Sequence, residues 1–258
     1  MKIAIIGFGE AGHMFGKHLA QHHDVHAYDV IQDAEIHSKA SNAGVTFHSD
    51  IVSAVCDSEY VFSLVTGDQA SVVAQDVAPH LGPQGYFFEM NSVAPETKQA
   101  NAMLCPRLVD IAIMSPVYPK QLAVPLLLSH PEGAYLADAL TRLGLNVKHI
   151  GADIGHAAAI KMCRSLMIKG MEALTIECFQ TARHFGIEAH VKASLHDSFP
   201  DMGWDGDRVD YWFERVATHG ARRATEMQEV AKTVESADLK AEMSNSIVAT
   251  LKHTSKRA

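Results

Sequence analysis

The first 150 residues alternate between short apolar runs and amphipathic stretches. Residues 1–6 are apolar and rich in β-branched side chains, a composition typical of a strand buried on both faces. Similar runs recur along this part of the chain, and helical patterns separate most of them. This alternation predicts an α/β fold with a doubly wound, mostly parallel sheet. Its further strands are expected at residues 25–29, 45–47, 60–65, 85–90, 108–113, 125–129 and 147–150.

The alternation stops near residue 150. A helical pattern of about 30 residues follows Gly155, and Gly186 is its predicted terminator. Residues 208–235 and 239–251 also have helical composition, and residues 252–258 are expected to form a loose tail. In the first part of the chain, Asp68 is a predicted N-cap for a helix that ends before Pro79.

Composition narrows the class of protein. The 258 residues are 47% hydrophobic and 20% charged, which is typical of a globular protein. A formal net charge of −8 disfavours general nucleic-acid binding. No apolar run approaches the roughly 20 residues that a membrane helix needs. The four cysteines lack C-x-x-C spacing and are expected to be reduced thiols, so we expect a cytoplasmic protein that binds neither nucleic acid nor membrane.

A glycine-rich turn follows the first predicted strand and precedes a helical pattern. Its first glycine permits a tight turn, its second lets the backbone approach a pyrophosphate, and its third lets the helix pack close to the strand. This context predicts a Rossmann-like dinucleotide-binding domain over residues 1–154, followed by an all-helical domain over residues 155–258. The turn residues expected to contact the cofactor are Gly7, Phe8, Gly9, Glu10, Ala11 and Gly12.

Asp29 lies at the end of the second predicted strand, 20 residues after Gly9. A carboxylate at this position can accept hydrogen bonds from both ribose hydroxyls of NAD, and it repels the 2′-phosphate of NADP. We therefore expect NAD to be preferred, with NADP possible. The alternative is a solvated aspartate at a strand end. Thr66, after the strand at 60–65, is also an expected cofactor residue.

The helix that follows Gly155 is small or apolar on nearly every side. Its exceptions, Lys161, Arg164 and Ser165, are spaced i, i+3 and i+4 and therefore share one face, which Lys169 extends. A cationic stripe on a mostly buried helix needs a partner, because unpaired buried charge is costly. An anionic ligand and internal carboxylates are equally good candidates.

Asn91 and Ser92 come directly after a predicted strand. Ligands of open parallel sheets bind at the carboxyl ends of the strands, so both side chains are expected to reach a substrate. The alternative is that one of them caps the helix that follows Pro95.

Three motifs together resemble the β-hydroxyacid dehydrogenase family, which includes 6-phosphogluconate and 3-hydroxyisobutyrate dehydrogenases. They are the N-terminal G-x-G-x-x-G, then N-S-x-x-P-E-T from Asn91, then G-x-x-x-x-x-K-M from Gly155. The resemblance covers roughly residues 1–185. Residues 222–227 look like part of the small helical domain of a phosphogluconate-dehydrogenase-like branch.

The resemblance implies that Lys161 is the catalytic acid/base and that Ser92 lies near both nicotinamide and substrate. Arg164 and Ser165 replace the family's usual His-Asn or Asn-Asn pair, and Ser115-Pro116-Val117 replaces its Ser-Gly-Gly loop. The family's second glycine before the lysine is Ala157 here. The expected substrate-binding residues are Asn91, Ser92, Ser115, Arg164 and Ser165.

These observations predict an NAD(P)-dependent oxidoreductase that transfers a hydride between nicotinamide and a small, anionic, hydroxy-acid-like substrate. The alternatives are an imine or aldehyde reductase on the same scaffold, or a dinucleotide-binding sensor without turnover. His18, His22 and His26 lack a completing Cys or carboxylate, so no metal site is expected. As in the family, a homodimer through the helical domain is expected.

Overall fold

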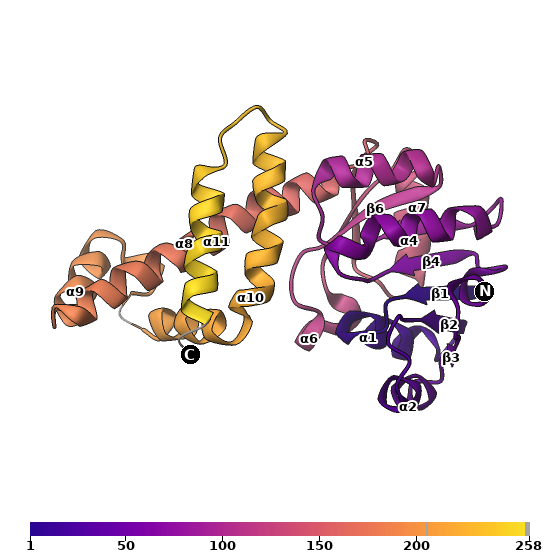
Figure 1. Cartoon of the computed structure of the whole chain (residues 1–258), viewed down its shortest axis with the longest axis horizontal. Helices are drawn as coiled ribbons and strands as arrows, with labels where there is room; N and C mark the ends of the chain where they lie inside the picture. Colours follow the sequence, from indigo (N-terminus) through magenta and orange to yellow (C-terminus); the bar gives the residue numbers. More distant parts are fainter. Residues whose placement is uncertain (205, 256–258) are drawn as a thin grey trace. The chain divides into compact units, whose positions relative to one another are not determined.

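A computed structural model describes residues 1–204 and 206–255, and the chain divides into two compact units (Figure 1). The first unit, Met1–Lys161, contains a β-sheet, and the described residues of the second, Met162–Ala258, form helices and turns. The division lies within helix α8 (His156–His184), a few residues after the boundary expected at 154/155. The first turn of α8 belongs to the first unit because its amide groups are hydrogen-bonded to a side chain of the sheet.

The strands of the described residues are β1 (Lys2–Ile6), β2 (Asp24–Tyr28), β3 (Thr46–Phe47), β4 (Tyr60–Ser63), β5 (Tyr86–Glu89), β6 (Leu108–Ile113), β7 (Leu126–Ser129) and β8 (Val147–Gly151). They form one sheet in the order β3-β2-β1-β4-β5-β6-β7-β8, and neighbours are parallel except for β6 and β7. The predicted α/β class and each predicted strand are confirmed. The antiparallel β7 is not predicted, because the apolar pattern of a strand carries no information about its direction.

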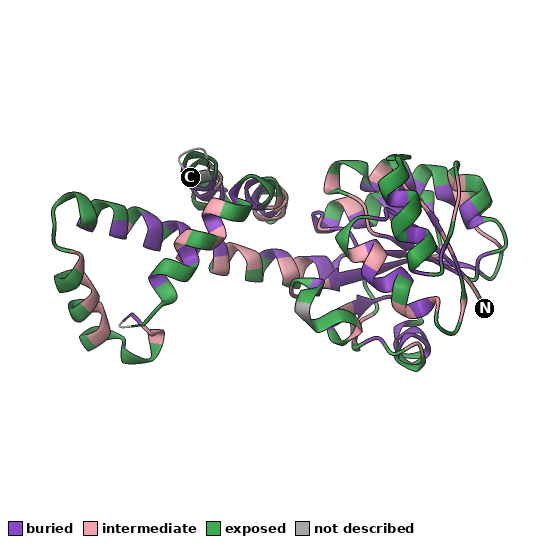
Figure 2. Cartoon of the chain, turned by 90° about the horizontal axis from the view of Figure 1, so that it is seen from below, coloured by how far each residue is buried: buried purple, intermediate pink, exposed green. Residues whose placement is uncertain are grey.

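The helices of the first unit are α1 (Glu10–Leu19), α2 (Ala34–Asn42), α3 (Ile51–Val55), α4 (Ala70–Val77), α5 (Pro95–Leu104), α6 (Val117–Lys120) and α7 (Gly133–Arg142), with 3₁₀ turns at Gly67–Gln69, Ala78–His80 and Gln121–Ala123. They cover both faces of the sheet because neighbouring strand residues point to opposite faces. Ile3 and Ile5 pack with α1, α2 and α7, whereas Ala4 and Ile6 pack with α3 and α4. In Figure 2, buried residues follow the strands and the inward sides of these helices.

Asp68 does not cap the helix that precedes Pro79, so this local prediction is wrong. A 3₁₀ turn comes first, and the N-cap positions belong to Thr66 for that turn and Gln69 for α4. Asp68 instead accepts a hydrogen bond from Gln69 Nε2 at 3.0 Å. Hydrogen bonds from Thr66 and Gln69 hold the pKa of Asp68 below its ordinary value. A polar residue before an apolar run fits either a cap or a turn.

The second unit continues α8 and adds α9 (Glu188–Ser198), α10 (Arg208–Glu235), α11 (Glu242–Ser255) and a 3₁₀ turn at Pro200–Met202. The predicted helical region is confirmed, although α9 is an additional helix. Gly186 ends α8 as predicted: its φ is +69°, and the Ile187 amide donates to Ala182 O at 2.9 Å. The expected loose tail is helical as far as Ser255, and residues 256–258 lie outside the described residues.

Apolar clusters hold the second unit together. Helices α10 and α11 lie side by side (Figure 1), and α8 contributes Ile176 to the core that they share. Trp204 and Trp212 pack with Phe179 in a neighbouring cluster, whereas Tyr211 is exposed. The two tryptophans therefore belong to the core of this unit.

Candidate active site

The glycine-rich turn joins β1 to α1 in a conformation that the chain itself requires. Gly7 has a φ of +92°, and a Cβ there would lie 2.5 Å from Leu64 O. A Cβ on Gly12 would lie 2.0 Å from Gly7 O, so this glycine permits close packing of helix on strand. A Cβ on Gly9 would meet nothing within 4 Å. The open side of Gly9 therefore fits the approach of a phosphate group to the backbone.

Beside Gly9, the other turn residues have different surroundings. Phe8 is only 1% exposed, with its side chain in the hydrophobic core and its amide bonded to Asp29, so it offers a ligand little direct contact. Glu10 is exposed and Ala11 is half-buried in the first turn of α1. No side chain caps the start of α1. The amino end of α1 therefore suits an anion, because helix N-termini present unpaired N–H groups.

Asp29 lies against this turn. Its Oδ2 accepts a hydrogen bond from the Phe8 amide at 2.6 Å, and its Oδ1 accepts one from the Ile31 amide at 2.9 Å. The three residues that follow Asp29 are exposed, and none is Lys or Arg. The turn and the carboxylate together fit the phosphates and ribose of a dinucleotide. Nothing in this segment supplies a cation for a 2′-phosphate.

Thr66 lies at the same edge of the sheet as the glycine-rich turn. Strands β1 and β4 are parallel neighbours, with Ile6 opposite Ser63, so the segments that follow them leave the sheet together. Thr66 is exposed there. Its position is compatible with the predicted cofactor contact.

Asn91 and Ser92 follow β5 at this edge. Asn91 is only 4% exposed, and its Nδ2 donates to Ser63 Oγ at 2.9 Å. Its Oδ1 is buried and has no hydrogen-bond partner among the described residues. Helix α5 begins at Pro95 with Ala94 as its N-cap and without a side-chain cap. The alternative that Asn91 or Ser92 caps this helix is therefore wrong.

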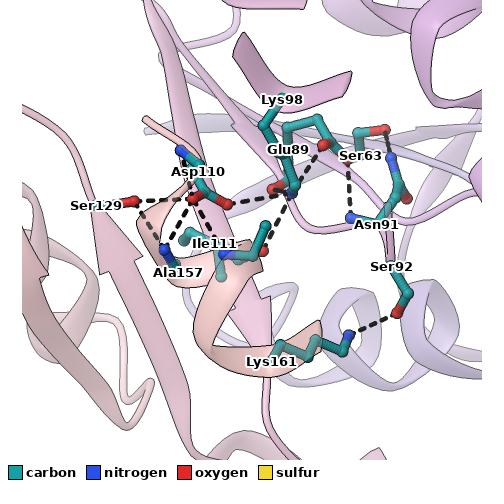
Figure 3. A network of polar contacts seen from close by, with 12 residues as sticks. Ser63, Glu89, Asn91, Ser92, Lys98, Asp110, Ile111, Ser129, Ala157 and Lys161 are labelled. Atoms are coloured by element: carbon teal, nitrogen blue, oxygen red, sulfur yellow. Dashed lines mark hydrogen bonds and ion pairs between the residues drawn. The ribbon is translucent and has the colours of Figure 1, made fainter. Parts of the chain in front are cut away.

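Lys161 and Ser92 are brought together across 69 positions of the chain (Figure 3). Lys161 Nζ donates to Ser92 Oγ at 2.5 Å, and both residues are half-buried. The contact lies wholly within the first unit. The charged end of Lys161 thus reaches the carboxyl end of β5, where ligands of such sheets bind.

Farther along α8, the polar stripe lies in the second unit. Arg164 is exposed and Ser165 is half-buried. Lys169 is buried and pairs with Glu226, with 2.6 Å between Nζ and Oε2. Burial lowers the pKa of Lys169, and the charge of Glu226 opposes this effect. An internal carboxylate is therefore the partner of Lys169, whereas Lys161 meets a hydroxyl at the strand ends.

Ser115 follows β6 and is half-buried. Its Oγ is buried and has no hydrogen-bond partner among the described residues. A hydroxyl that lacks a partner is costly to bury. Ser115 therefore remains compatible with the predicted substrate contact.

Sequence reasoning missed three charged residues that are wholly buried beneath this edge. Lys98 Nζ lies 2.7 Å from Glu89 Oε2 and 3.5 Å from Asp110 Oδ1, and all three residues are 0% exposed (Figure 3). The available signal was a single acidic residue in each of two apolar strands, in the segments Tyr-Phe-Phe-Glu-Met and Leu-Val-Asp-Ile-Ala-Ile.

Among the described residues, no group of three or more His, Cys, Asp or Glu side chains is placed to hold a metal ion. None of the helices formed by these residues has the length and hydropathy needed to cross a bilayer.

A parallel sheet with a glycine-rich turn after β1 and an aspartate after β2 defines a Rossmann-type dinucleotide-binding protein. Residues 2–107 match the family model described as the NAD binding domain of 6-phosphogluconate dehydrogenase. Residues 182–254 match a domain of unknown function (DUF1932). The chain therefore combines an NAD-binding domain of the 6-phosphogluconate dehydrogenase type with this C-terminal domain of unknown function.

Relatives share both parts of the chain. A conserved hypothetical protein from Sinorhizobium meliloti 1021 is 35% identical, with a TM-score of 0.83, over 99% of this chain and 89% of its own. A conserved protein of unknown function, described as structurally similar to 3-hydroxyacid dehydrogenases, is 25% identical, with a TM-score of 0.81. The match covers 99% of this chain and 97% of that protein. An uncharacterized 28.5 kDa protein of Methanothermus fervidus is 26% identical over 93% of both chains.

The contrast between two glycines tests the turn. Gly9→Ala should leave the melting temperature nearly unchanged, because its Cβ meets nothing, yet weaken NADH binding by about tenfold or more. Gly12→Ala is the matched control and should cost about 1–3 kcal/mol of stability, because its Cβ overlaps Gly7 O. Calorimetric titration and thermal unfolding measure both effects. Unchanged NADH affinity in Gly9→Ala would contradict a phosphate site at this turn.

Proposed function

We propose that the protein is an NAD-dependent dehydrogenase of small, anionic, hydroxy-acid-like substrates, with Lys161 as general acid and base. The observation that carries the proposal is the 2.5 Å contact between Lys161 Nζ and Ser92 Oγ at the carboxyl end of β5. This contact lies at the sheet edge that also bears the glycine-rich turn and Asp29. The family's NAD-binding domain and a relative described as similar to 3-hydroxyacid dehydrogenases support the class of reaction.

The first unit supplies the residues that would hold the cofactor. The turn backbone around Gly9 and the amino end of α1 suit the phosphates, and Asp29 suits the ribose hydroxyls. Thr66 and Ser92 lie on segments that leave the same edge. NAD, when bound, supplies the hydride acceptor.

Lys161 would act as the general base and general acid for the substrate hydroxyl. In the oxidation direction, neutral Lys161 Nζ accepts the proton of the substrate hydroxyl as the hydride leaves the carbon that bears this hydroxyl. In the reduction direction, the ammonium returns that proton to the carbonyl oxygen. Ser92 Oγ accepts a hydrogen bond from Nζ and thereby holds the lysine in one orientation.

Groups that could bind the substrate follow strands β5 and β6 or lie beside Lys161 on α8. Asn91 Oδ1 and Ser115 Oγ are buried without partners among the described residues and follow the adjacent strands β5 and β6. Arg164 and Ser165 lie one turn beyond Lys161 on the same helix face. Arg164 is suited to a substrate carboxylate because its guanidinium donates two parallel hydrogen bonds.

The remaining expectations follow from the same proposal. All four cysteines are free, in keeping with a cytoplasmic protein. A turnover screen with NAD and NADP over hydroxy acids, including 3-hydroxyisobutyrate, tests the reaction class. Activity on imines or aldehydes alone would identify a reductase of those compounds, and NADH that binds but is never oxidised by any carbonyl compound would identify a sensor.

Asp29 predicts the choice between cofactors. NADH should bind more tightly than NADPH. Asp29→Ala should reduce the ratio of their two dissociation constants by about tenfold, because hydrogen bonds to a charged group contribute about 1.5–3 kcal/mol. Fluorescence titration of both cofactors measures this ratio. Equal or tighter binding of NADPH to the unmodified protein would overturn the preference for NAD.

Two substitutions on α8 separate catalysis from substrate binding. Lys161→Met should lower kcat by about 10²–10⁴-fold and leave NADH affinity nearly intact, since positioned acid–base catalysis contributes that factor. Arg164→Ala should act mainly on the KM of the carboxylate substrate. Steady-state kinetics and NADH titration distinguish the two patterns. Near-normal turnover in folded Lys161→Met would make the lysine structural.

The expected homodimer has a candidate surface on the helical unit. Met167 and Leu174, seven residues apart on α8, are 66% and 71% exposed. Residues seven apart lie on one face of a helix, two turns apart, and exposed apolar side chains that gather on one face can form an interface. Light scattering at micromolar concentration should give a dimer, and Met167→Glu combined with Leu174→Glu should convert it to a monomer. A monomer before substitution would end this proposal.

A further inference from the structure

The buried cluster of Lys98, Glu89 and Asp110 is not used by the mechanism above. Burying three charges is costly unless each is paired and hydrogen-bonded. Lys98 Nζ pairs with both carboxylates and also donates to Glu89 O at 2.5 Å and Ile111 O at 3.3 Å. The cluster thus joins α5 to the carboxyl end of β5 and to the middle of β6, beneath the candidate active site.

Asp110 reaches from β6 to the start of α8. Its Oδ2 accepts hydrogen bonds from the amides of Gly155 at 3.0 Å, Ala157 at 3.1 Å and Ala158 at 3.3 Å, and from Ser129 Oγ at 2.8 Å. A helix normally receives such a cap from a side chain at its own N-cap position. Gly155 has no side chain and a φ of +101°, so a carboxylate 45 residues away in sequence takes this role.

Lys161 lies in the second turn of α8, directly above the first. In an α-helix, the amide of residue 161 donates to the carbonyl of residue 157, and the amide of Ala157 is itself held by Asp110. A shift of the first turn therefore shifts Lys161. Because the negative carboxylate faces the positive end of the helix dipole, its attraction adds to the hydrogen bonds.

The same cluster holds the segment that bears Ser92. Glu89 Oε1 accepts a hydrogen bond from the Asn91 amide at 2.9 Å, and Lys98 neutralises the other oxygen of that carboxylate. Both members of the 2.5 Å contact between Lys161 and Ser92 are thus attached to groups that share Lys98. One buried amine connects the helix of the proposed acid/base to the loop of its hydroxyl partner.

We propose that Asp110 and Glu89, joined by Lys98, are positioning residues that set Lys161 against Ser92. This proposal rests on the proposed role of Lys161. A cluster that only stabilised the fold would lower the melting temperature when altered, without a specific effect on Lys161. A misplacement of about 1 Å can cost about 10²-fold in rate, so a positioning role should be visible in kinetics.

The first test needs no substrate. Trace acetylation of the full chain with acetic anhydride, followed by peptide mass spectrometry, reports the reactivity of Lys161 relative to exposed Lys148. Asp110→Asn and Glu89→Gln should each raise the relative labelling of Lys161 severalfold, because its contact with Ser92 loosens. The matched control is Tyr86→Phe at the other end of β5, which loses a 2.7 Å hydrogen bond to Glu132 and should leave labelling unchanged.

The second test uses turnover of 3-hydroxyisobutyrate with NAD, alongside NADH titration. Asp110→Asn should lower kcat by about 10–100-fold with little change in NADH affinity. In a Lys161→Met background, the same substitution should have almost no further effect on the residual rate, because Asp110 acts through the lysine. Ser129→Ala removes one hydrogen bond to Asp110 and should show the same pattern more weakly. This variant keeps the proposal testable if Asp110→Asn fails to fold.

The outcomes separate the two proposals. Full turnover in Lys161→Met would overturn the proposed function itself. Loss of turnover in Lys161→Met, combined with unchanged labelling and kcat in folded Asp110→Asn, Glu89→Gln and Ser129→Ala, would overturn the positioning role alone. If Asp110→Asn lowers the rate of turnover by the same factor in the unmodified protein and in Lys161→Met, the positioning role is also overturned.

Discussion

The carboxylate of Asp110 is buried at the centre of the first unit, and the arrangement of the candidate active site depends on it. A buried carboxylate is tolerated only when donors surround it. Here three backbone amides and a serine hydroxyl supply hydrogen bonds, and Lys98 supplies the opposing charge. The same contacts satisfy amides that an uncapped helix would leave unpaired. The same hydrogen bonds therefore offset both the cost of burying the charge and the cost of starting a helix at a glycine.

Parallel strands explain why so many functional candidates lie together. The segments that follow β1, β4, β5 and β6 all leave the sheet at one edge. The glycine-rich turn, Thr66, Ser92 and Ser115 lie on these segments, although more than 100 positions separate the first from the last. Lys161 reaches that edge from α8. The residues proposed for cofactor recognition and proton transfer thus share one edge, and all of them belong to the first unit.

The sequence predicted the strands well because a buried parallel strand is apolar throughout, and such runs are short and bounded. It also predicted Gly7 and Gly12, whose roles depend on local backbone geometry. Pairing Lys161 with Ser92 required the family resemblance, since no spacing rule links positions 69 apart. The partners of Asp110 could not be predicted for the same reason, because they are far from it in sequence. The expected domain boundary was set before α8, because nothing in the local sequence shows that Asp110 ties the first turn of that helix to the sheet.

Helix α8 runs from His156 to His184 without a break, and the proposed acid/base lies close to its start. In a loop, an added or deleted residue is absorbed by a change in the path of the chain. In a helix, each such change rotates everything that follows by about 100° and displaces it by about 1.5 Å along the axis. The stretch between the Asp110 cap and Gly186 therefore does not tolerate changes in length. Variation in chain length among relatives should be confined to the segments on either side of it.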